Sequence, residues 1–377
     1  MADWYCPLPF RHVFVDSTGL APCCQIQRQA GDLDNWHNNK NLIRIQEQTL
    51  KGLVPTECQI CVDQETAQGT SLRTSSLEDY SHQRFETVDI DFVDYRSSNI
   101  CNFRCRSCEP QFSHGINNDY LYNSELTNFG QPVRTKTIGV DETNQDWIVR
   151  NLSKLHRLMF TGGEPTVIPE VVTILEHVIK QDLPNLNILI TTNGSFSDDF
   201  WYKLVQRHPR IHWTVSVDAV GPAAEIVRHG TEWSRIDYNL QWLSKHAVSM
   251  DINTVISNLN LFQLGPLLKL VRKLQLQSQE SGQMGSEGIR HQFYTCRKPS
   301  HHAADNWPDD LRSKSISYLQ HCLALDLDST QQNAIESLMN LILFGKFDET
   351  LWTRTQKYNQ ILDKMRDQNH LVLYQEI

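Results

Sequence analysis

Three cysteines, at positions 101, 105 and 108, stand within the eight residues CNFRCRSC, and the next cysteine along the chain is Cys296. Cysteine thiolates are the usual ligands of iron-sulfur clusters, and a four-iron cluster needs four ligands. Three thiolates in one loop therefore leave one iron open to another molecule. The spacing predicts a cluster that is held by Cys101, Cys105 and Cys108 and that binds a cofactor or substrate at its fourth iron.

A structural zinc site is the alternative for this loop. Zinc would need a fourth ligand from elsewhere in the chain, such as His114. Structural zinc sites usually pair their cysteines in two C-x2-C or C-x4-C units. The C-x3-C-x2-C spacing therefore favours a cluster over zinc.

A Gly-Gly turn followed by a carboxylate lies in the run MFTGGEP, at residues 159–165. Gly162 and Gly163 have no side chains, so the backbone there can approach a ligand closely. Glu164 adds a carboxylate that could accept hydrogen bonds from an ammonium group. A turn of this kind is common by itself, but here it comes one strand-helix unit after the cysteine loop.

Polar residues also end the two predicted strands that follow. Asn193 lies in TTNG at 191–194, Ser216 lies in SVD at 216–218, and Arg228 comes shortly afterwards. Each position has an ordinary structural explanation as well: a turn at Asn193, a helix cap at Asp218 and a surface position for Arg228.

In this order, the motifs resemble those of the radical S-adenosylmethionine (radical SAM) enzymes. In that family the open iron of a [4Fe-4S] cluster is chelated by the amino and carboxylate groups of SAM. The resemblance implies that the GGEP turn contacts the SAM amino group and that polar residues at later strand ends bind other parts of SAM. The cofactor-binding residues implied in this way are Gly162, Gly163, Glu164, Asn193, Ser216 and Arg228.

One position departs from the family pattern. Many members have an aromatic residue just before the third cysteine, where it packs on the adenine, whereas this chain has Ser107. The adenine contact must then come from elsewhere, and the candidates are Phe103 and the backbone near Ile256.

Five further cysteines precede the core motifs and can close a second metal site. The sequence around them resembles the auxiliary-cluster module called SPASM or twitch, here ahead of the core as in one subgroup, and the ending ILDKMRDQNHLVLYQEI resembles the same subgroup. Zinc on four thiolates is the alternative. The adjacent Cys23 and Cys24 cannot easily both bind one metal, and the spacing from Gly19 favours Cys24 without deciding between them. The resemblance implies an auxiliary [4Fe-4S] cluster whose ligands come from Cys6, Cys23, Cys24, Cys58 and Cys61.

A sheet has to position these residues. Runs at 88–95, 158–162, 188–192, 211–218 and 250–257 have strand character, and helical patterns at 171–179 and 236–247 lie between them. Alternating strands and helices predict parallel βαβ units. We therefore expect an α/β fold, a partial (β/α)6 TIM-type barrel, with the site at the carboxyl ends of its strands.

Three regions are predicted: an auxiliary-cluster domain at 1–84, the core barrel at 85–300 and a helical extension at 301–377. The extension carries an apolar stripe typical of a helix, made of Leu351, Thr355, Tyr358, Leu362 and Met365. The aperiodic stretch 113–144 is predicted to be a loop and is a candidate lid over the site. Cys296 and Cys322 are isolated in sequence and are expected to be packed in the core.

The composition indicates a globular protein: 40% of the 377 residues are hydrophobic and 21% are charged. A net charge of -9 without a cluster of Lys or Arg argues against nucleic acid as a partner, including the tRNA on which some radical SAM enzymes act. The first residues lack a signal-peptide core, and no run reaches ~18 apolar residues. We therefore expect a cytoplasmic protein without membrane association, whose cysteines bind metal instead of forming disulfides.

The resemblance implies an enzyme. A reduced cluster would pass one electron to the SAM sulfonium, giving methionine and a 5'-deoxyadenosyl radical that takes a hydrogen atom from the substrate. Twitch and SPASM relatives often modify peptides or proteins, so a peptide is the leading substrate, and a carbohydrate or small metabolite is the alternative. Flavodoxin or ferredoxin is the expected reductant. A metal-stabilised binding or electron-transfer protein without SAM turnover is the alternative from another class.

Overall fold

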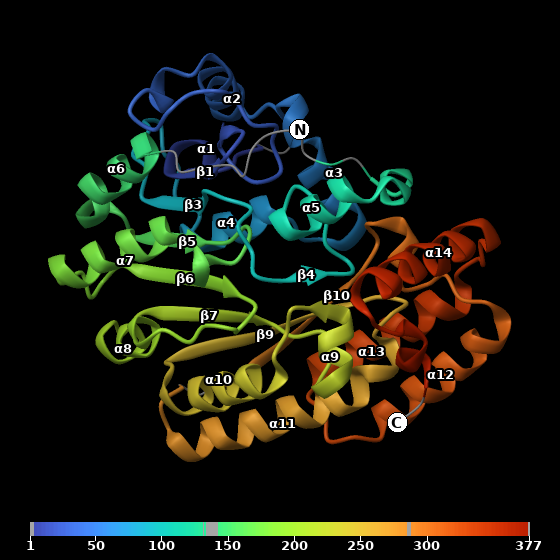
Figure 1. The fold of residues 1–377 in the computed structure, drawn as a ribbon. Helices are drawn as coiled ribbons and strands as arrows, with labels where there is room; N and C mark the ends of the chain where they lie inside the picture. The colour runs from blue at the N-terminus through green and yellow to red at the C-terminus, as the bar shows by residue number, and fades with distance from the viewer. Residues whose placement is uncertain (1–3, 131, 133–141, 285–287, 376–377) are drawn as a thin grey trace. The chain divides into compact units, whose positions relative to one another are not determined.

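The computed structural model describes residues 4–130, 132, 142–284 and 288–375 (Figure 1). Its contacts divide the chain into two compact units. The first unit holds residues 1–98, 136–162 and 168–189, and the second holds residues 99–135, 163–167 and 190–377. The predicted domain boundaries at 84 and 300 stay predictions, because this division follows contacts and joins segments that are distant in sequence.

The first unit is built on a mainly parallel sheet, with strand order β5-β3-β1-β2. Strands β1, β3 and β5 run parallel, and β2 is antiparallel to β1 at the edge. The strands of this unit are β1 (His12–Asp16), β2 (Gly19–Ala21), β3 (Phe92–Arg96) and β5 (Arg157–Phe160). Its helices are α1 (Leu8–Arg11), α2 (Lys40–Leu50), α3 (Gln59–Gln68), α4 (Leu72–Asp79), α6 (Glu142–Asn151) and α7 (Pro169–Gln181).

The cysteine-rich N-terminal segment supplies strand β1, which the sequence analysis did not predict. Its residues Val13, Phe14 and Val15 are buried. β1 lies parallel to β3, so that Val13 stands opposite Val93. The segment was expected to have little core of its own, and it gains one by extending the sheet that also contains β3.

The second unit contains the parallel strands β10, β9 and β7, in that order, and a separate antiparallel pair of β4 and β8. Its strands are β4 (Arg104–Cys105), β7 (Ile211–Ser216), β8 (Arg228–His229), β9 (Ser249–Ile256) and β10 (Arg290–Thr295). Its helices are α5 (His114–Tyr122), α8 (Asp199–Arg207), α9 (Gly221–Val227), α10 (Trp233–His246), α11 (Leu264–Ser281), α12 (Asp309–Leu323), α13 (Ser329–Phe344) and α14 (Glu349–Arg366). Strand β6 (Asn187–Thr192) continues from the first unit into the second after Leu189.

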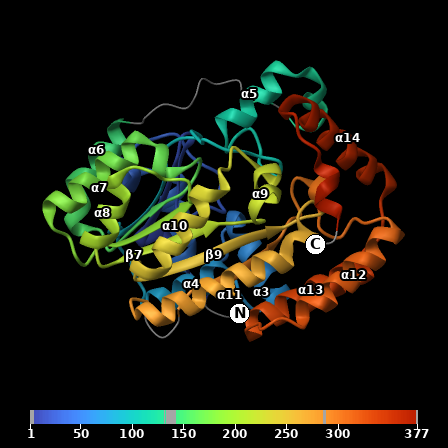
Figure 2. The same cartoon turned by 60° about the horizontal axis from the view of Figure 1, so that its bottom comes forward.

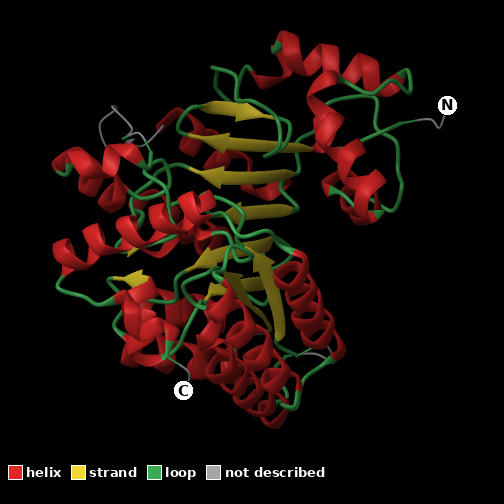
Figure 3. Ribbon diagram, turned by 90° about the vertical axis from the view of Figure 1, so that its right-hand side faces the viewer, coloured by secondary structure: helices red, strands yellow, loops and turns green. Residues whose placement is uncertain are grey.

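The predicted α/β class is confirmed, with parallel strands and connecting helices as in a partial TIM-type barrel (Figure 3). All five predicted strands are present, as β3, β5, β6, β7 and β9. On β7 the side chains of Ile211, Trp213 and Val215 are buried, while Thr214 and Ser216 on the opposite face are half-buried. The alternation therefore leaves a polar row that ends at Ser216.

The C-terminal region is helical, as predicted. Helices α11, α12 and α13 share a buried core that includes Trp307, Leu319 and Ile335. On α14 the predicted stripe is buried at Thr355, Tyr358 and Leu362, whereas Met365 near its end is 39% exposed. Cys322 lies in the same core, and Cys296 is buried too, which confirms that both are packed.

The prediction of a loop at 113–144 was wrong over its first part, which forms α5 and a 3-10 helix, Ser124–Asn128. Ser113 caps α5 by accepting a hydrogen bond from the backbone N–H of Ile116. Ile116 and Tyr120 are buried four residues apart on α5, a helical spacing that the Asn-rich composition concealed, and Leu126 of the 3-10 helix joins the same buried cluster. Residues 131 and 133–141 of the candidate lid lie outside the described residues.

Within the described ranges, no helix combines the length and the apolar character that a membrane span requires.

Candidate functional site

The three core cysteines lie around strand β4 in the second unit: Cys101 precedes the strand, Cys105 ends it and Cys108 follows it. Cys105 stands directly opposite Arg228, because β4 pairs with β8 in antiparallel register. Burial raises the pKa of the Cys101 thiol to about 12, and the nearby Cys105 raises it further. Burial also raises the pKa of the Cys108 thiol, and the neighbouring thiols of Cys105 and Cys101 raise it by smaller amounts. The three thiols therefore lie near one another in a poorly solvated place.

Their arrangement does not suit a single metal ion. Within the residues that the structure describes, no three His, Cys, Asp or Glu side chains are grouped closely enough to hold one ion. Zinc would require four ligand atoms at about 2.0–2.3 Å from one point. His114, the fourth ligand of the zinc alternative, accepts a hydrogen bond through its Nδ1 from the backbone N–H of Cys101, at 3.1 Å. His114 thus stabilises the conformation of the loop through this hydrogen bond.

The GGEP turn packs against the backbone at the start of the cysteine loop and is hydrogen-bonded to it. At Gly163 an added Cβ would lie 2.0 Å from the carbonyl oxygen of Ile100, so only glycine fits. The backbone N–H of Glu164 donates to the same oxygen, at 2.8 Å. In the first unit Gly162 has a φ of +108° and lies against the backbone of Ser98. The glycines therefore allow close packing against the residues just before Cys101, and the predicted approach to a ligand stays a prediction.

Glu164 is 1% exposed, and its carboxylate has partners within the chain. One oxygen accepts from the hydroxyls of Thr166 and Thr192, at 2.6 and 2.7 Å, and the other accepts from the backbone N–H of Asn193, at 2.6 Å. Burial raises the pKa of this carboxyl group although these hydrogen bonds oppose it. Glu164 joins its own loop to the loop after β6. Its contact with the SAM amino group stays a prediction.

Asn193 is tied to the cysteine loop through a residue that the sequence analysis missed. Its Nδ2 donates to the Oδ1 of Asn102, at 2.9 Å, and its Oδ1 accepts from the backbone N–H of Ser195. Asn102 in turn donates to the hydroxyl of Ser195, at 2.8 Å. Asn102 belongs to no motif. Only its position between Cys101 and Cys105 could have drawn attention to it.

Arg228 lies beside the cysteines and has one unused donor. Its Nη1 donates to Asp218, at 2.8 Å. Its Nε is buried and has no hydrogen-bond partner among the described residues. Burial acts to lower the pKa of Arg228, but Cys105 and Asp218 outweigh it and raise the pKa. Ser216, at the end of β7, stands opposite Asn253 of β9.

Arg106 anchors the cysteine loop to other parts of the second unit, a role that the sequence analysis did not predict. Its side chain is fully buried. It donates to Asp363 of α14 at 2.5 Å, to Asn359 at 3.1 Å and to the carbonyl oxygen of Ile226 at 3.0 Å. The carbonyl oxygen of Arg106 accepts from His302, at 3.0 Å. A buried arginine between two cysteine ligands is thus anchored by the C-terminal helix.

Helix α14 also meets α5, and the two lie side by side in both views (Figures 1 and 2). Asp119 of α5 accepts from Arg104 and from Arg366, both at 3.0 Å. Because Arg104 precedes Cys105, the C-terminal helix fixes the loop on both sides of that cysteine. The sequence carried no motif that links positions so far apart.

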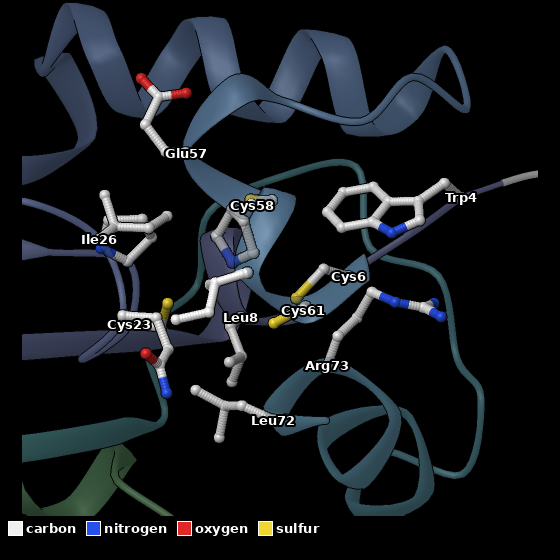
Figure 4. A pocket seen from close by; sticks show the side chains of 14 residues that line it. Trp4, Cys6, Leu8, Cys23, Ile26, Glu57, Cys58, Cys61, Leu72 and Arg73 are labelled. Carbon is white, nitrogen blue, oxygen red and sulfur yellow. The ribbon is translucent and has the colours of Figure 1, made fainter. Parts of the chain in front are cut away.

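A second group of cysteines lines one cavity in the first unit (Figure 4). The space between its lining residues is about 360 Å³ and includes open solvent. Cys6 comes just before α1, Cys23 follows β2, and Cys58 and Cys61 lie at the start of α3. Burial raises the pKa values of Cys6 and Cys58 to about 12 each, and neighbouring cysteines add to the effect. These four cysteines therefore face one space.

Cys24 lies away from this cavity wall. Burial and Asp94 raise its pKa, while Arg96 and Arg28 act to lower it. Cys23 and Cys24 lie in a turn after β2, and only Cys23 is among the residues that line the cavity. The cavity therefore favours Cys23 over Cys24, although the spacing from Gly19 had favoured Cys24.

Residues 95–271 match the sequence model of the Radical SAM superfamily. This range contains the three-cysteine loop, the GGEP turn and Arg228. The chain contains a region, residues 95–271, that matches the radical SAM superfamily. The predicted core cofactors, a [4Fe-4S] cluster and SAM, are those of this superfamily, and this prediction is confirmed.

Individual relatives are more distant. A GTP 3',8-cyclase from Acidothermus cellulolyticus is 32% identical over 127 residues, which cover 33% of this chain and 30% of the cyclase. The structure of anSMEcpe with AdoMet and the Cp18Cys peptide is 19% identical, covers 60% of this chain and 56% of that one, and has a TM-score of 0.37. SuiB from Streptococcus suis with S-adenosylmethionine is 13% identical, with coverages of 83% and 68% and a TM-score of 0.39. The chain thus spans less than a third of the curated relative that it matches.

Gly163→Ala is expected to displace the cysteine loop, because the new Cβ would meet the Ile100 carbonyl at 2.0 Å. Overpacking of this kind costs about 1–3 kcal/mol. We expect the variant to bind less iron than the wild type after anaerobic reconstitution, as measured by iron analysis. Gly282→Ala is the control, since it strains a backbone with a φ of +67° at a position where the added Cβ would meet no described atom within 4 Å. Wild-type iron content in Gly163→Ala would contradict the proposed packing of the GGEP turn against the cysteine loop.

Asp363→Asn is expected to destabilise the fold by about 3–5 kcal/mol, because it removes the charge partner of the buried Arg106. Burial acts to raise the pKa of Asp363, but His370 and Arg106 outweigh it and lower the pKa. The stabilisation is therefore complete above the ordinary Asp pKa and is lost as the pH falls through the lowered one.

Urea unfolding at pH 7 measures this loss. The matched control is Asp326→Asn, which breaks an ion pair with Arg272 whose Asp326 side chain is 74% exposed. Exposed pairs contribute about 0–1 kcal/mol. Equal losses in the two variants would contradict an anchoring role for Asp363.

Proposed function

We propose that this chain is an enzyme that cleaves SAM reductively at a [4Fe-4S] cluster held by Cys101, Cys105 and Cys108. One observation carries the proposal: the three thiols are gathered in one loop, and that loop is fastened to the GGEP turn through Ile100 and to α14 through Arg106. A loop held so firmly with three thiolates can keep one coordination position open, which is what the binding of SAM requires.

The chain's own residues prepare this position. Arg228 presents an unpartnered Nε–H next to Cys105, which suits the SAM carboxylate, and its pairing with Asp218 fixes the guanidinium. Ser216 ends the polar row of β7 and would bind another polar group of SAM. Gly162 and Gly163 keep side chains out of the turn, so the SAM amino group can approach the backbone.

The bound group supplies the reactive chemistry. When reduced, the cluster would give one electron to the SAM sulfonium, so that a carbon–sulfur bond breaks into methionine and a 5'-deoxyadenosyl radical that takes a hydrogen atom from a substrate C–H bond. The protein contributes orientation and the exclusion of water.

The auxiliary site belongs to the same proposal, with Cys6, Cys23, Cys58 and Cys61 as the ligands of a second [4Fe-4S] cluster. Support comes from the single cavity that these four thiols line. Four protein thiolates would leave no iron open, which favours an electron-transfer role over substrate binding.

A peptide or protein is the proposed substrate, because the auxiliary-cluster module that the first 84 residues resemble often accompanies peptide modification. A flavodoxin or ferredoxin is the proposed reductant. A cytoplasmic location is proposed as well, since all ten cysteines are free of disulfides, as expected in a reducing compartment.

Anaerobic incubation with dithionite and SAM, followed by chromatography for 5'-deoxyadenosine, tests the core proposal. Cys105→Ala should reduce product formation to the background without enzyme, because it removes a ligand of the reacting cluster. Cys322→Ala, at a buried cysteine in the C-terminal core, should leave product formation close to that of the wild type. Equal product from the wild type and Cys105→Ala would refute the proposal.

Iron analysis of two neighbouring variants tests the auxiliary site. Two four-iron clusters give about eight irons per chain, so Cys23→Ala should retain about four and Cys24→Ala about eight. The reverse order would assign the ligand to Cys24. Zinc with only about four irons in the wild type would show that the cavity holds a zinc site.

A further inference from the structure

The wall of the four-cysteine cavity contains a buried hydrogen-bond donor that no protein group accepts. Trp4 lines the cavity and is 9% exposed. Its indole Nε1 is buried and has no partner in the part of the chain that the structure describes. Figure 4 shows the ring beside Cys6, with its nitrogen-bearing edge turned toward Cys6 and Arg73. A buried donor without an acceptor is unfavourable, so an acceptor inside the cavity would relieve a penalty.

The other donors at this wall are already used. Arg73 donates to both oxygens of Glu65, at 2.9 and 2.6 Å, and to the carbonyl oxygen of Tyr5, at 3.0 Å. The hydroxyl of Ser76, which lies 4.0 Å from the sulfur of Cys6, donates to the carbonyl oxygen of Arg73, at 2.7 Å. Since Glu65 neutralises Arg73, the indole N–H is the buried donor at this wall that remains available to a ligand.

Arg73 also fixes the ring itself. Its guanidinium carbon lies 5.5 Å from the centre of the Trp4 ring, within the range of a cation–π contact. The side chain of Arg73 is held in turn by Glu65 and by the backbone of Tyr5, the residue next to Trp4. The indole is therefore oriented before any ligand binds.

We propose that the Trp4 Nε1–H donates a hydrogen bond to a sulfur of the auxiliary cluster and thereby raises the reduction potential of that cluster. Reduction adds negative charge to the cluster sulfurs, so a hydrogen bond to sulfur is stronger in the reduced state and stabilises it. The consequence is a direction of electron flow: the auxiliary cluster accepts an electron after hydrogen abstraction more readily than it supplies one. This inference rests on the proposed auxiliary cluster.

A potentiometric titration of the anaerobic holoenzyme with SAM, followed by electron paramagnetic resonance, tests the inference. SAM changes the signal of the cluster with the open iron, so the signal that does not respond to SAM belongs to the auxiliary cluster. Trp4→Phe keeps the ring and removes the N–H. We expect its auxiliary cluster to have a lower midpoint potential, by up to about tenfold in the ratio of oxidised to reduced cluster at a fixed potential, or 59 mV for one electron.

Trp36→Phe is the matched control. Trp36 is 3% exposed in the same unit, and its Nε1 also lacks a partner within the described ranges, but it does not line the cavity. Its substitution should leave the potential at the wild-type value. An unchanged potential in Trp4→Phe, or an equal shift in both variants, would overturn the assignment of Trp4.

A second measurement needs no variant and so does not depend on whether Trp4→Phe folds. The wild-type chain, with all nine tryptophans labelled with 15N in the indole ring, should show a 15N coupling to the reduced auxiliary cluster in electron–nuclear double resonance. Absence of the coupling would overturn the proposal. A wild type without any second cluster signal would overturn the auxiliary site together with this inference, while a SAM-responsive first cluster would still uphold the core activity.

Discussion

The constraint behind this structure is that a loop with three thiolates must be rigid if the fourth position of its cluster is to stay open. A mobile loop could close on its metal or collect a further ligand. Here the backbone before Cys101 is locked against Gly163, where a single added carbon would lie 2.0 Å from a carbonyl oxygen. The far side is locked by Arg106, whose buried charge is matched by Asp363 at 2.5 Å. An open coordination position would thus depend on the surrounding packing as much as on the cysteine spacing.

The two cysteine groups illustrate how local chemistry separates two roles for similar ligands. The core loop lies beside Arg228, whose buried Nε–H has no partner among the described residues. In the proposed function, this donor suits a small anionic group that binds reversibly. The N-terminal cavity is lined by four thiols, and the arginine among its lining residues is neutralised by Glu65. A site of that kind retains its occupant. Strand β1, which joins this segment to the sheet beside β3, gives the small domain a fixed base.

The sequence predicted the parts of the fold that depend on local patterns. The strands β3, β5, β6, β7 and β9 and the stripe of α14 follow from periodicity, because burial imposes the same spacing everywhere. β1 was missed because HVFVD is short and stands among cysteines and turns, and α5 was missed because its buried residues are spaced among asparagines. The predicted site residues rest on motifs. Arg106, Asp363 and Trp4 have none, since their roles arise from contacts between segments that only the folded chain brings together.

Mössbauer spectroscopy of the chain reconstituted with 57Fe, with and without SAM, tests the central claim most directly. An open iron among the cysteines of the core loop should change its isomer shift when SAM coordinates it, while the other three irons of that cluster keep theirs. A cluster in which no iron responds to SAM, or a loop filled with zinc in preparations given sufficient iron and sulfide, would contradict the account.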